Sequence, residues 1–276
     1  MINKLSIGKN ILPTLPALIP LVAAALRNEI VTSRHVLDTG KLNRPIKIVL
    51  LADLHSTRHG KRQRNLVEKI RSERPDLIMM AGDMLDERRT FAPAAELLRY
   101  AVKIAPVFYV SGNHEYCIKN IGYFFTAMEK LGVSILRDEH KTIEVNGQSI
   151  LIAGADDPEL DRFIPGYKQS TAMRKAFSGL KDDGLPKILL AHRPELFARY
   201  ARYPFDLVLS GHAHGGQVRI PFLDRGVLSH TGLFPRYTSG MHSLGKCRMI
   251  ISRGLSIFPL LPRVYNPPEI VSIMLK

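Results

Sequence analysis

The hydrophobic positions of the chain gather into short apolar runs that polar residues hardly interrupt. Runs of this length that are rich in branched side chains predict β-strands, and the lack of alternation between polar and apolar residues predicts strands covered on both faces. Five such runs are expected to form the central strands: residues 46–52, 76–81, 107–110, 187–191 and 206–210.

Helical periodicity separates several of these runs. Apolar residues recur on one face of residues 63–74, 94–104 and 121–131, which predicts three amphipathic helices that cover a sheet. A shorter helical pattern spans residues 171–178. Alternating strands and helices of this kind indicate an α/β protein.

A second set of shorter strands is predicted later in the chain. Residues 142–145 and 149–153 flank an Asn-Gly pair at 146–147, which is a strong hairpin signal. Further strands are expected at residues 133–136, 249–252 and 270–275. The predicted architecture is therefore two packed mixed sheets flanked by helices, an αββα sandwich.

Polar residues with metal-ligand chemistry directly follow the five central runs. Ligands of α/β sheets bind beyond the carboxyl ends of the strands, so these residues are expected to converge on one crevice. Carboxylate, amide and imidazole ligands without a thiolate suit Mn, Fe, Zn or Mg rather than a structural zinc knot. The candidates are Asp53, His55, Asp83, Asn113, His192, His212 and His214. Seven ligands are too many for one ion, whereas two ions that share a bridging carboxylate would use them all.

The order of these motifs resembles that of the calcineurin-like metallophosphoesterases: Asp-x-His, Gly-Asp-x-x-Asp, Gly-Asn-His-Glu, a single His and Gly-His-x-His. The resemblance covers roughly residues 44–276 and implies the same αββα fold. A Gly-Gly-Gln sequence after the last ligand and Asn-Pro-Pro-Glu-Ile near the C-terminus are similar to a bacterial branch found at membranes and cell walls.

The resemblance also implies the division of the ligands and the reaction. Asp53, His55 and His214 would hold a first ion, Asn113, His192 and His212 would hold a second, and Asp83 would bridge them. The expected reaction is hydrolysis of a phosphodiester or pyrophosphate bond by hydroxide held between the ions, on a lipid-linked or nucleotide-linked substrate. The alternatives are a phosphomonoesterase, including a protein phosphatase, and a non-catalytic protein that binds phosphate through its metals.

His114 follows the ligand Asn113 and is not itself a ligand in the family pattern. Its imidazole is expected to donate a proton to the leaving oxygen or to stabilise the phosphoryl charge. Either Glu115 or Asp86 would supply the carboxylate that orients an imidazole. Arg193 and Gln217 are expected to contact the substrate.

Other polar residues near the motifs allow two interpretations. Arg88, Arg89 and Arg219 either contact phosphate or keep their loops soluble, and His59 and His230 either lie on the substrate rim or are ordinary loop residues. His35, His140 and His242 are expected to be exposed and outside the site.

Two long irregular stretches, residues 156–184 and 222–246, are expected to carry specificity. The second contains Leu228, Leu233 and Phe234, which either form an apolar rim for a lipid or nucleoside portion of the substrate or pack over the sheet.

The ligands span residues 53–214, which favours one domain over residues 44–276, preceded by a separate segment, 1–43. Residues 11–26 are almost wholly apolar but contain three prolines and fall short of the roughly 20 residues that cross a bilayer. They are expected to form a helix that lies on a membrane or on the domain, or else a cleaved export signal.

The chain has 276 residues with 39 basic and 25 acidic side chains, a net charge of +14. Such a field attracts anionic phospholipids, wall polymers or nucleic acid, but few aromatic residues accompany the basic ones, so no dedicated nucleic-acid partner is expected. Cys117 and Cys247 suggest neither a disulfide nor a thiolate metal site. A cytoplasmic protein at the membrane periphery fits these features, with export as the alternative.

Overall fold

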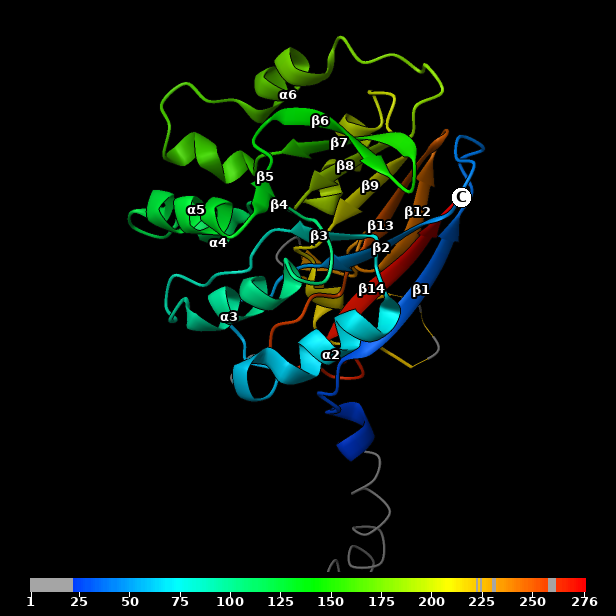
Figure 1. The fold of residues 1–276 in the computed structure, drawn as a ribbon. Coiled ribbons are helices and arrows are strands. Elements are labelled where there is room, and N and C mark those ends of the chain that lie inside the picture. The colour runs from blue at the N-terminus through cyan, green and yellow to red at the C-terminus, as the bar shows by residue number, and fades with distance from the viewer. Residues whose placement is uncertain (1–21, 222, 224, 230–231, 258–261) are drawn as a thin grey trace, which may run out of the picture.

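The computed structural model describes residues 22–221, 223, 225–229, 232–257 and 262–276 (Figure 1). Most of the apolar segment at 11–26 and His230 therefore lie outside the described residues. Among the described helices, none combines the length and the apolar character needed to cross a bilayer. Both cysteines are free, with Cys117 exposed and Cys247 buried.

The first sheet has six strands in the order β1-β14-β2-β3-β4-β5. All neighbours pair in parallel except β14 and β2, which are antiparallel. The strands are β1 (Val31–Leu37), β14 (Glu269–Leu275), β2 (Ile46–Leu51), β3 (Leu77–Ala81), β4 (Val107–Val110) and β5 (Val133–Ile135).

The second sheet also has six strands, in the order β12-β13-β9-β8-β7-β6, with antiparallel pairs at both edges and parallel pairs between. Its strands are β12 (Gly240–Leu244), β13 (Cys247–Ile251), β9 (Leu207–Ser210), β8 (Lys187–Ala191), β7 (Gln148–Ala155) and β6 (Glu139–Val145). A small separate hairpin joins β10 (Leu228–Ser229) to β11 (Gly232–Leu233). The predicted pair of mixed sheets is thus confirmed.

The two sheets pack face to face between helices, and β2 shows why the central runs are almost wholly apolar. Ile46, Ile48 and Leu50 point into the core between the sheets, whereas Val49 and Leu51 point toward the helices. Successive side chains of a strand face opposite ways, so a strand covered on both faces has few polar positions, and in β2 the partly buried Lys47 is the only one. On the outer faces lie α2 (Arg64–Glu73), α3 (Ala92–Ala101), α5 (Ile121–Lys130), α6 (Gln169–Phe177) and α7 (Phe197–Tyr200).

The predicted hairpin at Asn146 and Gly147 is confirmed. Both residues have positive φ angles, 55° and 75°, and Val145 pairs with Gln148 on either side of them. A turn with two left-handed residues matches the twist of the flanking strands, and Asn-Gly is the sequence that adopts it most readily.

Two edge strands, β1 and β12, were missed by the sequence prediction. Their polar and apolar residues do not form the continuous runs of the central strands, because each edge strand has a partner on one side only. The first sheet consequently begins at Val31, upstream of the domain start expected at residue 44. His140 is exposed as expected, whereas His35 on β1 and His242 on β12 are partly buried.

Candidate metal centre

The seven predicted ligands meet at the carboxyl ends of the central strands. Asp53 and His55 follow β2, Asp83 follows β3 and Asn113 follows β4. His192 follows β8 and the last two ligands follow β9. Parallel strands end at the same edge of a sheet, and the face-to-face packing of the two sheets brings the two sets of loops together.

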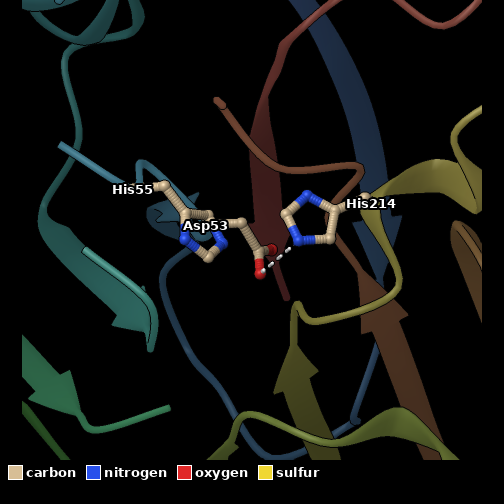
Figure 2. Close-up of side chains that lie close together, drawn as sticks. All are labelled: Asp53, His55 and His214. Carbon is tan, nitrogen blue, oxygen red and sulfur yellow. Dashed lines mark ion pairs between the residues drawn. The ribbon is translucent and has the colours of Figure 1, made fainter. Parts of the chain in front are cut away.

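Asp53, His55 and His214 form the first group. Their nearest ligand atoms lie within 4.8 Å of one another, and Figure 2 shows the Asp53 carboxylate and the two imidazoles gathered together. The His214 Nε2 lies 3.8 Å from Asp53 Oδ1. This is the set that the family resemblance assigned to one ion.

Asp83, His192 and His212 form the second group, within the same 4.8 Å limit. The His192 Nε2 lies 3.1 Å from Asp83 Oδ2 and 3.0 Å from His212 Nδ1. All three side chains are buried. A carboxylate and two imidazoles are suitable ligands for a divalent transition metal.

Asp83 lies between the two groups. Its Oδ2, which contacts His192, is also 3.6 Å from His55 Nε2 in the first group. Asn113 lines the same cavity as Asp83 and His212, and its Oδ1 is buried without a hydrogen-bond partner in the described part of the protein. A buried amide oxygen without a partner is costly unless a ligand satisfies it, so the residues present fit a pair of cations that share Asp83.

The backbone of these loops is unusual. Five of the seven candidate ligands have positive φ angles: Asp53 (51°), His55 (45°), Asp83 (52°), His212 (68°) and His214 (47°). This region is sparsely populated by residues other than glycine, and such conformations collect at functional sites.

Two glycines are needed because the loops pack too closely for a side chain. A Cβ atom on Gly112 would lie 2.2 Å from Asp83 Oδ1, and one on Gly82, whose φ is 84°, would lie 2.6 Å from His192 Nδ1. Glycine before Asp83 and before Asn113 therefore allows the loops that carry the second group to approach one another.

Hydrogen bonds from outside the ligand set orient the ligands. His192 Nδ1 donates to the Ala81 carbonyl oxygen at 2.7 Å, which directs Nε2 at Asp83. The backbone N–H of His212 donates to both carboxylate oxygens of Asp53, at 2.9 and 3.0 Å. Such outer contacts fix the tautomer and the direction of a ligating imidazole.

His214 depends on residues from the C-terminal part of the chain. Its Nδ1 lies 3.1 Å from Ser256 Oγ, and the buried Arg263 donates to the same hydroxyl and to the Ser256 carbonyl oxygen. The Asn266 amide donates to the carbonyl oxygens of His214 and Gln217. Asn266 is the first residue of the Asn-Pro-Pro-Glu-Ile motif, so this motif holds the last ligand loop in place.

Burial governs the charge of the first group. It lowers the pKa of His55 to about 3, lowers the pKa of His214 well below its usual value and raises that of Asp53 to about 7. Both imidazoles are therefore neutral near pH 7, the form that binds a metal.

The second group has the opposite balance. Burial disfavours charge on Asp83 and on His192, but their mutual attraction outweighs it. The pKa of His192 rises to about 10, and that of Asp83 falls well below its usual value. Without a metal these two side chains form a buried ion pair.

His114 lies on the wall of a cavity of about 350 Å³ above the ligands. Its ring centroid is 4.6 Å from that of His55, and its Nδ1 lies 2.7 Å from Glu87 Oε2. Burial alone would lower the pKa of His114, but Asp83 and Glu87 together raise it. The imidazole is thus held by one carboxylate, and the nearby negative charges favour its protonated form.

The structure gives different roles to Asp86 and Glu115, the two candidates for the carboxylate that orients an imidazole. Asp86 Oδ2 lies 3.8 Å from His55 Nδ1, so Asp86 is the carboxylate beside a ligand imidazole. Glu115 is fully buried and accepts hydrogen bonds from the backbone N–H groups of Asp83, Leu85 and Gly112. Glu115 therefore joins the second and third ligand loops.

The cavity wall includes Gln217 but not Arg193. The Arg193 guanidinium donates to both carboxylate oxygens of Asp157, and Glu159 and Glu195 lie within 3.7 Å of it. Three carboxylates around one guanidinium leave it poorly suited to bind phosphate. We expected Arg193 to contact the substrate, but the structure places its side chain outside the cavity wall and pairs it with Asp157.

The remaining arginines and His59 fall outside the cavity wall. Arg89 contacts the His55 carbonyl oxygen, Arg219 contacts the Gly215 carbonyl oxygen, and Arg88 is largely exposed. His59 is buried, with Nε2 2.8 Å from the Leu255 carbonyl oxygen, so it does not lie on a substrate rim.

Comparison with known proteins gives one family. A family model described as calcineurin-like phosphoesterase matches residues 46–216. A Caenorhabditis elegans protein named as a metallophosphoesterase is 36% identical over 187 residues, which are 64% of this chain and 38% of that protein. The metallophosphoesterase YkuE of Bacillus subtilis is 30% identical over 236 residues, 83% of this chain and 79% of YkuE.

Two further proteins extend the comparison. The phosphodiesterase YaeI of Escherichia coli is 27% identical over 241 residues, 84% of this chain and 82% of YaeI. Among solved structures, the NAD nucleotidase NadN of Haemophilus influenzae superposes with a TM-score of 0.54 at 16% identity over 78% of this chain and 46% of NadN, a likeness of fold alone. The chain thus spans less than half of the worm protein and of NadN, and about four fifths of the two bacterial relatives.

Proposed function

Because the chain belongs to the calcineurin-like phosphoesterase family, we propose that it is a metal-dependent phosphodiesterase that hydrolyses phosphodiester or pyrophosphate bonds with two divalent ions. The observation that carries this proposal is the position of Asp83, whose carboxylate lies between two groups of neutral or ion-paired ligands beneath an open cavity. Mn, Fe, Zn and Mg all suit the oxygen and nitrogen ligands present.

When bound, such ions supply Lewis acidity toward a phosphoryl oxygen and a nucleophile derived from water at neutral pH. The first would be held by Asp53, His55 and His214, the second by Asn113, His192 and His212, with Asp83 shared. Five of these side chains are buried, all except Asn113 and His214, and low exposure to solvent strengthens their electrostatic interactions.

His114 provides the proton for the leaving group in this proposal. Its Nδ1 is held by Glu87, which leaves Nε2 for the substrate, and Asp83 and Glu87 raise its pKa and so favour the protonated ring. A general acid of this kind contributes roughly 10²- to 10⁴-fold in rate. Gln217, on the same wall, would donate to a phosphoryl oxygen.

Two observations favour a diester over a monoester. Leu228 and Ser229 line the cavity beside the ligands and would contact a second ester group. The relative that is named a phosphodiesterase, YaeI, is similar over 84% of the chain.

The test compares Asp83→Ala, His114→Ala and the exposed-surface control His140→Ala for hydrolysis of bis(para-nitrophenyl) phosphate with Mn. We expect Asp83→Ala to lose bound metal and all turnover, because both groups lose their shared ligand. We expect His114→Ala to keep its metal and lose roughly 10²- to 10⁴-fold in turnover. A chelator should abolish wild-type activity, and para-nitrophenyl phosphate should be the poorer substrate.

Wild-type turnover in both site variants would refute the assignment of the centre. Faster hydrolysis of the monoester by the same preparation would refute the diester preference and leave the metal centre standing.

A further inference from the structure

Exposed apolar side chains lie where the chain enters the first sheet. Residues 22–25 are helical, and the exposed fractions of Val22 and Leu26 are 52% and 42%. The Ala25 carbonyl oxygen accepts a hydrogen bond from the N–H of Tyr265, at 2.6 Å. Tyr265 directly precedes Asn266, which holds the His214 loop. This helical turn is therefore fastened beside the metal centre.

A second set of exposed apolar side chains follows Gln217. The set comprises Ile220, Leu223, Leu228, Leu233 and Phe234, and the last two are exposed to 71% and 57%. The loop is anchored where the N–H of Arg219 donates to the carbonyl oxygen of Val264, the residue before Tyr265. Its hairpin pairs Leu233 with Leu228, which lines the cavity. Both apolar sets thus attach to the same short segment, residues 264–265.

Basic side chains lie at the same end of the molecule. The start of α2 and the turn before it, η1 (Lys61–Gln63), expose Lys61, Arg62 and Arg64 around a hollow of about 340 Å³ that also includes Glu68 and Arg71. A neighbouring hollow is lined by Asn28 and Glu29 on one side and His59 and Asn65 on the other, so the N-terminal segment adjoins this basic turn. Figure 1 shows residues 22–26 and α2 together at the lower end.

We propose that this end of the molecule, defined by the helical turn 22–26, the exposed apolar set from Ile220 to Phe234 named above and the basic turn 61–64, docks on an anionic phospholipid bilayer. Exposed Leu, Ile, Val and Phe side chains enter the boundary between headgroups and acyl chains, and basic side chains around them pair with anionic headgroups. The chain has no charged residue from position 11 to position 26, which extends the apolar character of the turn in sequence.

The chemistry of the surface favours lipid over nucleic acid. Single-stranded nucleic acid needs aromatic rings for base stacking, whereas six of the seven exposed apolar side chains of the turn and loop are aliphatic. The net charge of +14 supplies the long-range attraction to an anionic membrane.

Docking in this orientation turns the cavity toward the headgroup layer. If the proposed hydrolysis holds, the substrate class is then a phosphate ester carried by a membrane lipid, since Leu228 connects the docked hairpin to the cavity wall. This part of the inference rests on the proposed function, whereas the docking itself does not.

The experiment is flotation of the full chain with vesicles of phosphatidylcholine alone or mixed with phosphatidylglycerol. One variant reverses charge at the basic turn, Lys61→Glu with Arg62→Glu, and another places charge on the hairpin, Leu233→Asp with Phe234→Asp. Controls change charge elsewhere: Arg174→Glu with Lys175→Glu on α6, at the upper end in Figure 1, matches the basic-turn variant, and Tyr123→Asp adds a single charge at an exposed ring on α5.

We expect wild type and both controls to float with phosphatidylglycerol vesicles. The basic-turn variant should lose about fivefold in affinity for each basic side chain removed, and the hairpin variant should lose binding to both kinds of vesicle. Turnover of bis(para-nitrophenyl) phosphate, a soluble substrate, should be unchanged in the basic-turn variant.

Wild type that stays unbound with phosphatidylglycerol vesicles, or controls that lose as much binding as the test variants, would overturn the docking proposal. Preparations that bind vesicles but leave the soluble diester intact would instead overturn the proposed function. Equal hydrolysis of a phosphodiester on a lipid and in solution would overturn the lipid-borne substrate.

Discussion

The two ligand groups share Asp83 but differ in what orients them and in the charge they carry. In the first group, His214 is oriented by a side chain, the Ser256 hydroxyl, which Arg263 also contacts. In the second, His192 is oriented by a backbone carbonyl oxygen at the end of β3. The Ser256 hydroxyl can be removed by substitution, whereas the Ala81 carbonyl oxygen belongs to the backbone of the sheet.

The charge difference indicates how binding of a metal ion to each group would depend on pH. Burial leaves the imidazoles of the first group neutral, and its last proton sits on Asp53, whose pKa is about 7. In the second group the proton sits on His192, whose pKa is about 10, because Asp83 stabilises the imidazolium. A metal must displace this proton before it binds Nε2, so the second group competes with protons over a wider pH range.

The largest effect that tests this difference is the pH dependence of metal affinity. A protonated imidazole cannot be a ligand, so affinity rises with pH until the proton has left. Affinity for the second ion should rise about tenfold per pH unit up to about pH 10, whereas affinity for the first should level off above about pH 7. Titration of metal-free protein with Mn against a competing chelator measures both constants.

Asp53→Asn is the companion variant, since it removes the titrating carboxylate of the first group. Because Asp53 also helps to raise the pKa of His192, the steep second dependence should remain but end at a lower pH. Two constants with the same pH slope in wild type would show that the groups are electrostatically equivalent, contrary to this comparison.

The sequence was sufficient for the central strands and the ligands because both depend on local information. A strand covered on two faces is almost wholly apolar, and each ligand lies in the loop that directly follows such a strand. The edge strand β1 escaped prediction because its register depends on β14, more than 200 residues later, as the Ser33 to Glu269 hydrogen bond shows at a separation of 236.

The supports of the ligands were beyond sequence reasoning for the same reason. Ser256 lies 42 residues from His214, and Ala81, whose carbonyl oxygen accepts from His192, lies 111 residues from His192. Glu87 was overlooked although it adjoins Asp86, because only the path of the loop decides which of two neighbouring carboxylates reaches His114. The Asn-Pro-Pro-Glu-Ile motif drew attention to Asn266 in the sequence, but the sequence did not show that Asn266 holds the His214 loop.

A smaller effect is expected from removing the side-chain support of the first group. Ser256→Ala deletes the hydroxyl beside His214 Nδ1, and loss of such an outer contact typically weakens metal binding about 10- to 100-fold. Only the first ion should be affected, because His192 keeps its bond to Ala81. Elemental analysis at limiting Mn measures this, with Ser33→Ala on β1 as the control. Equal loss of both ions would indicate that the two groups are supported together.

The smallest effect concerns His114, which lies on the cavity wall above the ligands. Glu87→Gln keeps an acceptor for His114 Nδ1 but removes the charge that helps to raise the pKa of this imidazole. We expect turnover of the diester to fall about tenfold while KM and the bound metal stay unchanged, since general acids contribute roughly 10²- to 10⁴-fold and the acid itself remains.

The pH profile of Glu87→Gln distinguishes a positioning role from a structural one. A general acid acts in its protonated form, so activity is lost as pH rises through its pKa, and a lower pKa moves this alkaline limb to lower pH. Glu144→Gln, the same change at an exposed position of β6, should leave the limb where it is in wild type. An alkaline limb that does not move in Glu87→Gln would mean that Asp83 alone sets the proton affinity of His114, and that the carboxylate at position 87 only shapes the loop.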